Sequence, residues 1–150
     1  MCIRDRTYAV STMGADHTSG YTIAPEILGV SGKLDPLNPD KAELARNFQY
    51  ATAFLDSTGH CLFIAFAILD IASGFEGMIE ECNGVLGTDW EVDDAARIGK
   101  EIIGLERDFN RRAGFTELDD RLPEFMTREK LPPHDAVWDI PAEEIDKVLG

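Results

Sequence analysis

Basic residues are scarce in this chain of 150 residues. Lysine and arginine together number 14, against 28 aspartates and glutamates, which gives a formal charge of -14. Nucleic acids and anionic membrane surfaces are bound through a basic footprint. The charge balance therefore argues against both kinds of partner.

Cysteines are also few: the chain has Cys2, Cys61 and Cys82. Three cysteines are too few for a disulfide scaffold, and no two share the C-x-x-C spacing of a self-contained zinc or iron–sulfur site. The simplest location for such a chain is a reducing compartment, the cytoplasm.

Long hydrophobic runs are absent. The longest run extends from Cys61 to Leu69, whereas a membrane-spanning helix needs about 20 apolar residues. The first residues contain no apolar segment of the secretory type. Because the run is apolar on all sides, it predicts a helix buried inside the protein.

Strand-like alternation and internal repeats are missing as well, while hydrophobic residues make up 44% of the chain. We predict one all-α fold of about five to six helices. Residues 7–37, rich in glycine and proline, are expected to form loops with at most one helical turn. The expected helices start at Asn38-Pro39-Asp40 and end near residues 56–59, then cover 61–69, 75–86, 92–112, 116–126 and 141–149.

The helix over 92–112 has the strongest pattern. Thr88 and Glu91 predict a capping box before it, and its apolar stripe comprises Val92, Ala95, Ile98, Ile102, Leu105 and Phe109. Two ion pairs are expected on its surface, Asp93 with Arg97 and Asp108 with Arg112.

The first six residues, Met-Cys-Ile-Arg-Asp-Arg, are similar to translated adapter sequence at the ends of truncated environmental reading frames. We expect residues 1–6 to be a non-native leader and residues 7–150 to be the protein itself. A native, charged N-terminal segment is the alternative.

The first stretch that could carry chemistry is Met13-Gly14-Ala15-Asp16-His17-Thr18-Ser19-Gly20. An imidazole such as that of His17 can transfer protons near neutral pH. A loop histidine that only hydrogen-bonds the backbone is the alternative, because spacing identifies no partner for it.

The second stretch is Asp56-Ser57-Thr58-Gly59-His60-Cys61, where one helix ends and the next begins. Asp56 could accept two parallel N–H bonds from a planar ligand, and a helix N-terminus favours the thiolate form of Cys61, which binds metals. The alternatives are a helix-capping aspartate and a small buried cysteine, since one thiolate cannot hold a cluster.

Other polar and aromatic residues have simpler interpretations. Cys82 is expected in the core, and Trp90 and Trp138 as packing anchors. The pair Asp119-Asp120 predicts a solvated or ion-paired turn, and His134 is not assigned a role.

Taken in order, the motifs resemble the C-terminal part of the aldehyde ferredoxin oxidoreductase family. They are the two stretches above, followed by Ile98-Gly99, Leu105-Glu106-Arg107, Phe109-Asn110, Arg112-x-Gly114-Phe115 and Asp119-Asp120-x-Leu122-Pro123. The resemblance covers nearly everything from Tyr8 to Leu149, and it implies the later half of the helical domains of that family.

The resemblance implies an oxidoreductase that oxidises aldehydes to carboxylic acids at tungsten or molybdenum held by two pterins, beside a [4Fe-4S] cluster. Ferredoxin would accept the electrons, and homo-oligomers are possible. His17 matches the family histidine near the metal, Asp56 the carboxylate that binds the pterin, and Cys61 the fourth cluster ligand. The pterin would also contact Gly59, His60 and Leu62 in the turn, and Met13 and Ser19 in the early loop.

Two features depart from the family pattern. His60 stands where leucine is usual, and the three other cluster cysteines are absent, so we expect them upstream and expect the chain alone to be inactive. Two other hypotheses stay open. The chain could be a non-enzymatic helical interaction module, or a family relative that reduces a carboxylate or an aromatic thioester.

Overall fold

The computed structural model describes residues 5–29, 42–133 and 135–149. Within these ranges the chain is helical, and its backbone pairing of the β type is limited to one isolated bridge between Leu131 and Ala136. The all-α prediction is confirmed. The elements are α1 (Asp5–Val10), a π-helical turn (Ala24–Leu28), α2 (Ala42–Ser57), a 3-10 turn (Leu62–Ile64), α3 (Ala65–Asp70), α4 (Ala72–Leu86), α5 (Val92–Arg112), α6 (Phe125–Arg128) and α7 (Ala142–Leu149).

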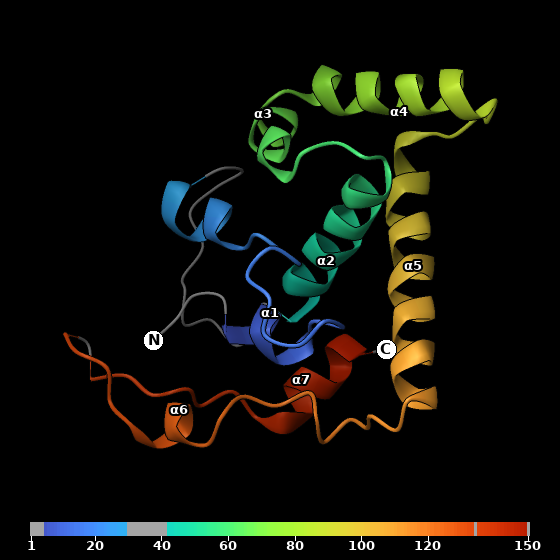
Figure 1. The fold of residues 1–150 in the computed structure, drawn as a ribbon. Helices are drawn as coiled ribbons and strands as arrows, with labels where there is room; N and C mark the ends of the chain where they lie inside the picture. Colours follow the sequence, from blue (N-terminus) through green and yellow to red (C-terminus); the bar gives the residue numbers. More distant parts are fainter. Residues whose placement is uncertain (1–4, 30–41, 134, 150) are drawn as a thin grey trace.

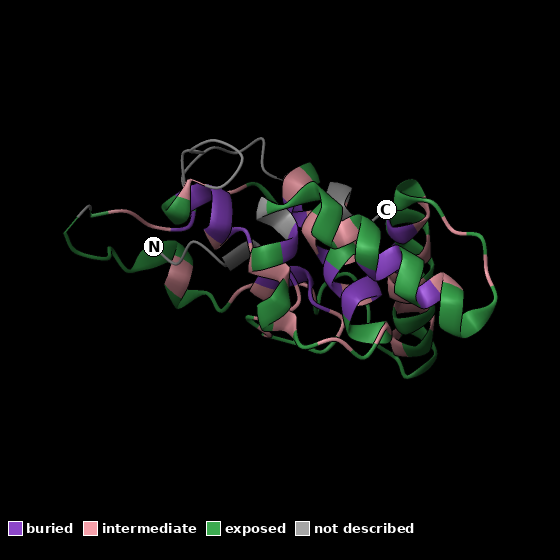
Figure 2. Cartoon of the chain, turned by 90° about the horizontal axis from the view of Figure 1, so that it is seen from above, coloured by how far each residue is buried: buried purple, intermediate pink, exposed green. Residues whose placement is uncertain are grey.

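The two longest helices form the centre of the molecule. α2 packs along α5, while α4 lies across one end of α5 and α1 and α7 pack near the other end of α2 (Figure 1). Buried residues lie mainly where these helices meet, and much of the outer surface is exposed (Figure 2). Within the described residues, no helix combines the length and the apolar character needed to cross a bilayer.

α2 and α5 approach each other most closely at Gly99. A Cβ atom at this position would lie 1.9 Å from the carbonyl oxygen of Tyr50. The two backbones are therefore in direct contact, and a side chain on α5 would force them apart.

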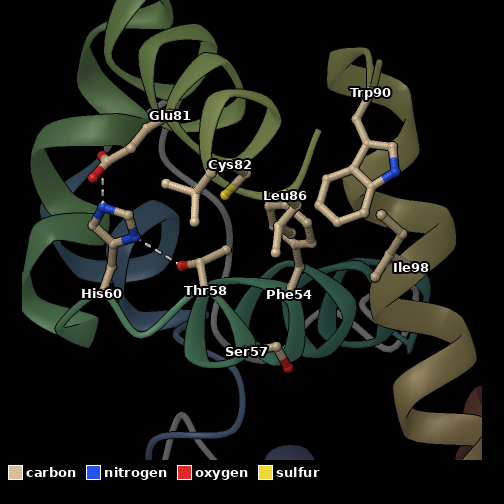
Figure 3. A pocket seen from close by; sticks show the side chains of 10 residues that line it. Phe54, Ser57, Thr58, His60, Glu81, Cys82, Leu86, Trp90 and Ile98 are labelled. Atoms are coloured by element: carbon tan, nitrogen blue, oxygen red, sulfur yellow. Dashed lines mark hydrogen bonds and ion pairs between the residues drawn. The ribbon is translucent and has the colours of Figure 1, made fainter. Parts of the chain in front are cut away.

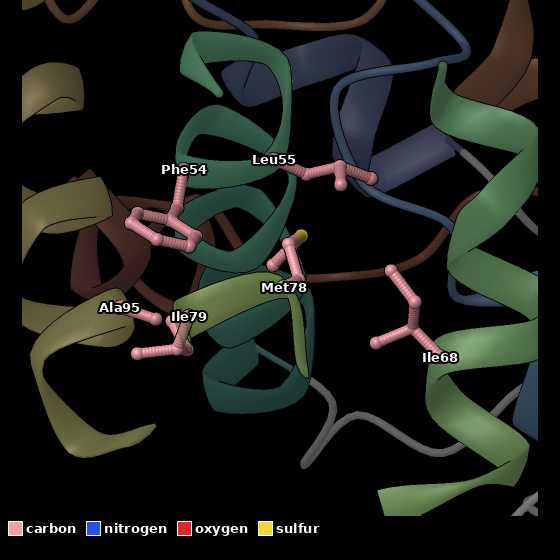
Figure 4. Packing of buried hydrophobic residues seen from close by; sticks show 6 residues of the cluster. All are labelled: Phe54, Leu55, Ile68, Met78, Ile79 and Ala95. Carbon is pink, nitrogen blue, oxygen red and sulfur yellow. The ribbon is translucent and has the colours of Figure 1, made fainter. Parts of the chain in front are cut away.

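Two hydrophobic clusters stabilise this arrangement. The larger joins α2, α3, α4 and α5 and contains Phe54, Leu55, Ile68, Met78, Ile79 and Ala95 (Figure 4). The smaller joins α1 to α7 and contains Ala9, Val10, Trp138 and Ile145. Burial of Trp138 confirms its predicted role as a packing anchor, and Trp90 contacts Phe54 edge-to-face, with 6.1 Å between ring centroids.

α5 has the predicted bounds but a different cap. The reciprocal hydrogen bonds of the capping box join Glu91 and Asp94, one turn later than the Thr88–Glu91 prediction. The reason is that the Thr88 hydroxyl donates to the Asn83 side chain instead, at 2.8 Å. Asn83 also bonds both backbone groups of Trp90, so it fixes the link between α4 and α5.

The surface charges of α5 follow the prediction only in part. Arg112 pairs with Asp108 at 2.6 Å, as predicted. Arg97 pairs with Asp94 at 2.7 Å and with Glu101 at 3.0 Å, rather than with Asp93.

The predicted apolar stripe of α5 is buried only at Ala95, with Ile98 and Ile102 half-buried. Ala95 is buried against α2, but Leu105 and Phe109 are each 72% exposed. The stripe continues along the helix to Leu105 and Phe109, beyond the part that neighbouring helices cover.

The prediction of a buried helix over 61–69 is wrong. Cys61 has an extended backbone, a 3-10 turn follows, and α3 begins only at Ala65. Phe63 is 73% exposed, whereas Ile68 is buried in the larger cluster. An all-apolar run can be buried on all sides only where neighbours surround it, and the described residues supply neighbours on one side.

Two further predictions need correction. The helix expected over 116–126 is replaced by a turn in which the Asp119 carboxylate accepts bonds from the backbone and hydroxyl of Thr116, and helix resumes only at Phe125. This local bonding competes with helix formation. The region 7–37 contains two helical turns rather than at most one, because α1 buries Ala9 and Val10 against α7.

Several predictions lie outside the described residues: the helix start at Asn38-Pro39-Asp40, His134 and residues 1–4. Asp5 and Arg6 belong to α1. Within the described residues the count of helices exceeds the expected five to six because of α1, the π-helical turn and the 3-10 turn, which are short segments.

Candidate functional site

The turn after α2 carries the acid and the thiol of the second motif. Asp56 is in the last turn of α2, and the chain reverses at Gly59, whose φ of 80° is rarely adopted by residues with a side chain. The amide of Gly59 donates to the carbonyl oxygen of Asp56 at 3.2 Å. Cys61 follows as an exposed free cysteine, so the turn presents Asp56 and Cys61 on the outside of the helix pair.

The early loop is organised by Asp16 rather than by His17. The Asp16 carboxylate accepts bonds from the amide and the hydroxyl of Thr18, each at 2.9 Å, and the Ser19 hydroxyl donates to the Asp16 carbonyl at 3.4 Å. His17 and Met13 are exposed. The loop therefore has a defined shape and leaves the imidazole of His17 accessible.

Three side chains of α5 hold the beginning of this loop. Arg107 donates to the carbonyl oxygen of Val10 at 2.6 Å, and Asn110 donates to that of Thr12 at 2.7 Å. The hydroxyl of Thr12 donates to Glu106 at 2.5 Å. Sequence reasoning included these three residues in motifs but gave them no role, because the loop lies far away along the chain.

The two motif stretches lie near one another. Partial burial of its carboxyl group raises the pKa of Asp56, and the negative charges of Asp16 and Glu106 raise it further. Such electrostatic coupling requires that the early loop, the end of α2 and the middle of α5 be neighbours. The ring of Tyr21, just after the loop, also contacts that of Phe66 in α3 edge-to-face, at 5.7 Å between centroids.

His60 points to the other side of the turn. Its Nδ1 lies 2.8 Å from the Thr58 hydroxyl, and its Nε2 lies 3.3 Å from a carboxylate oxygen of Glu81 on α4 (Figure 3). These residues border a pocket of about 190 Å³ between α2, α4 and α5, which is otherwise lined mainly by apolar side chains. Buried Cys82 lines the same pocket, and burial raises the pKa of its thiol, so its prediction as a core residue is confirmed.

Met13 borders a second, larger groove. This groove of about 980 Å³ lies between the early loop, the end of α5 and residues 115–121. Arg107 and Asp120 form an ion pair there at 3.3 Å, which confirms the predicted ion-paired turn. Neither hollow is lined by His17, Ser19, Asp56, Gly59, Cys61 or Leu62. The structure thus places parts of the two motifs in different hollows and leaves His17, Asp56 and Cys61 outside both.

The side chains that could bind a metal fit only one part of a metal centre. No group of three or more metal-binding side chains occurs among the described residues, and Cys61 is a free, exposed thiol. One thiolate fits a single corner of a cluster whose other ligands come from elsewhere. The carboxylate of Asp56 is partly buried and has two acids, Asp16 and Glu106, near it, which favours a ligand that brings N–H donors to it.

Comparison with known proteins decides the family. The family model described as aldehyde ferredoxin oxidoreductase, domains 2 and 3, matches residues 5–149. The chain belongs to the aldehyde ferredoxin oxidoreductase family. The resemblance inferred from the motifs is therefore confirmed.

Relatives from the same family match most of this chain. The tungsten-containing aldehyde ferredoxin oxidoreductase of Pyrococcus furiosus is 38% identical to it over 128 residues. The enzymes of the same name from Pyrococcus horikoshii and Thermococcus kodakarensis are 36% and 34% identical. Each match covers 83% of this chain but 20% of the relative. The chain therefore spans about a fifth of the length of the curated relatives that it matches.

Proposed function

We propose that this chain forms the C-terminal helical part of an oxidoreductase that oxidises aldehydes to carboxylic acids and passes the electrons to ferredoxin. The main support is the proximity of the two motifs: Tyr21, directly after the early loop, contacts Phe66 in α3, shortly after Cys61. A histidine that handles protons and a thiol that binds a redox centre must lie near one reaction site to act together. The negative charge of Asp16, which acts on the carboxyl group of Asp56, supports the same arrangement.

In this proposal Asp56 binds a pterin of a tungsten or molybdenum bis-pterin cofactor, through N–H groups that donate to its carboxylate. Gly59, His60 and Leu62 surround the pterin with backbone atoms, and Met13 and Ser19 flank it from the early loop. Cys61 supplies one thiolate to a [4Fe-4S] cluster. When bound, the metal–pterin unit and the cluster supply the two-electron oxidation and the route by which electrons leave.

The residue of this chain that takes part in proton transfer is His17. Conversion of an aldehyde and water into a carboxylic acid releases two electrons and two protons. An imidazole nitrogen of His17 takes up a proton as water adds to the carbonyl carbon. Its exposure in a loop of defined shape leaves it accessible to such a substrate.

The decisive experiment extends the reading frame upstream and tests Cys61 in the extended protein. An upstream Cys-x-x-Cys-x-x-x-Cys motif would supply the remaining ligands. We expect Cys61→Ser to lower the iron content by at least about half and to abolish activity, because a cluster that lacks one thiolate is poorly retained. Iron is measured by colorimetric assay and the cluster by electron paramagnetic resonance.

Cys82→Ser is the matched control, since Cys82 is buried on α4 and has no assigned contact with the cluster. It should retain its iron. Unchanged iron and activity in Cys61→Ser would refute the cluster assignment, and normal turnover in His17→Ala with full metal content would refute the role of His17.

A further inference from the structure

A continuous set of hydrogen bonds ties the turn after α2 to α4. The oxygen of the Thr58 hydroxyl lies 2.6 Å from the carbonyl oxygen of Leu55 and 2.8 Å from Nδ1 of His60, and its one hydrogen serves either contact in turn. On the opposite side of the ring, Nε2 of His60 lies 3.3 Å from Glu81 (Figure 3). Because an ionised carboxylate can only accept, Nε2 carries the hydrogen of that bond.

Cys61 lies between two anchored residues. His60 before it is held by this set of hydrogen bonds, and Leu62 after it packs against the larger hydrophobic cluster. The backbone of Cys61 is extended, with ψ of 133°. In an extended segment successive side chains point to opposite sides, so inward anchoring of residues 60 and 62 directs Cys61 outward, where it is exposed.

The anchor matters because few side chains of the turn pack against the rest of the protein. Asp56, Ser57, Gly59 and Phe63 are exposed, whereas the side chain of His60 is only 23% exposed. Without the bond to Glu81, the polar link between this turn and α4 would be lost.

We propose that His60 is a positioning residue, which together with Glu81 fixes the turn so that the Cys61 thiol is held outward for its ligand. The inference rests on the proposed function, in which Cys61 binds a cluster. In this chain a hydrogen-bonded histidine holds the turn where the family pattern usually has leucine. Holding a ligand in place before the metal arrives reduces the entropy lost on binding.

The test measures amide hydrogen exchange by NMR in the full 150-residue chain, at the backbone amides of Thr58, Gly59 and Ile64. These amides donate within the turn, to the carbonyls of residues 54 and 55, 56 and 61 respectively. We expect His60→Ala to speed their exchange about tenfold relative to the core amides of α5, because two hydrogen bonds that close the turn are lost.

Three further variants separate positioning from a general loss of stability. His60→Gln keeps an N–H donor at the place of Nε2 and should restore slow exchange. Glu81→Ala should speed the same exchange to a smaller extent, because it removes one of the two bonds of His60, and adding Glu81→Ala to His60→Ala should change nothing further. The matched control is Glu80→Ala, an exposed carboxylate on the same helix, which should leave exchange unchanged.

Unchanged exchange in His60→Ala, or an equal effect of Glu80→Ala and Glu81→Ala, would overturn the positioning role. If His60→Ala does not fold, the surface variant Glu81→Ala decides alone. These measurements need no cofactor. The iron content of Cys61→Ser in the extended protein tests the proposed function separately, so the two ideas can fail independently.

Discussion

At the scale of single residues, two positions show how local chemistry acquires meaning from its neighbours. Gly99 has no sequence feature that separates it from Gly104 five residues later, yet the carbonyl of Tyr50 lies against one and nothing lies within 4 Å of the other. Asp56 looks like an ordinary helix-end acid, yet partial burial and the charges of Asp16 and Glu106 raise its pKa. Neither difference can be read from spacing along the chain.

Gly99→Ala should destabilise the fold by about 2–3 kcal/mol, because the added methyl would force α2 and α5 apart. Gly104→Ala on the same helix should instead stabilise it, by up to about 1 kcal/mol, through the higher helix propensity of alanine. Urea unfolding followed by circular dichroism measures both. Equal effects of the two substitutions would contradict the close approach at Gly99.

Asp56→Asn should make the chain more stable at neutral pH. The pKa of Asp56 is raised above 3.8 in the folded chain, so the stabilisation by its bound proton is fully present below that pH and is lost as the pH rises through the raised value. Because the side chain is exposed, we expect a gain of only about 0.5 kcal/mol at pH about 7, and none at pH about 3.

Urea unfolding at the two pH values measures this difference, and carbon NMR follows the carboxyl group directly. Asp16→Asn should lower the pKa of Asp56 by removing a neighbouring negative charge. An Asp56 pKa that does not respond to this change would show that the early loop is not beside the end of α2.

At the scale of elements, periodicity was a good guide wherever a helix was long and packed on one side. The bounds of α5 and α7 follow the pattern of apolar residues and end signals. The segments that were wrong are short. α3 and the turn at residues 116–119 depend on which neighbours are present and on one carboxylate, Asp119.

The attachment of the early loop to α5 depends on Arg107. Its side chain is 13% exposed and pairs with Asp120, whose pKa is raised by burial and lowered in part by Arg107. Arg107→Met should cost about 2 kcal/mol, because the carbonyl of Val10 and the carboxylate of Asp120 lose their donor in a partly buried place.

Thermal unfolding measures the cost, and exchange of the Gly14 amide, which donates to Ser11, reports the loop itself. Arg111→Met is the control: Arg111 is 68% exposed and its pair with Asp108 is long, at 3.7 Å. It should change stability by less than about 0.5 kcal/mol. Equal costs would mean that Arg107 does not hold the loop.

At the scale of the whole molecule, the described residues bring one candidate cluster ligand into position and leave many large apolar side chains exposed, among them Phe63, Leu105 and Phe109.

The 150-residue chain, reconstituted anaerobically with iron and sulfide, should therefore retain fewer than about one iron per chain after gel filtration. Iron analysis and visible absorption spectroscopy measure this directly. A stable cluster in the isolated chain would contradict the assignment of Cys61 as one ligand among four.

The sequence by itself determined the helical class, the long helices and, through the ordered motifs, the family, because these depend on short-range periodicity and on residue types at fixed spacing. Only the tertiary structure decided that Asp16 lies near Asp56, that His60 bonds Glu81 and that Arg107 holds the early loop. Each of these contacts joins residues far apart along the chain, and the packing of α2 against α5, closest at Gly99, determines which of them meet.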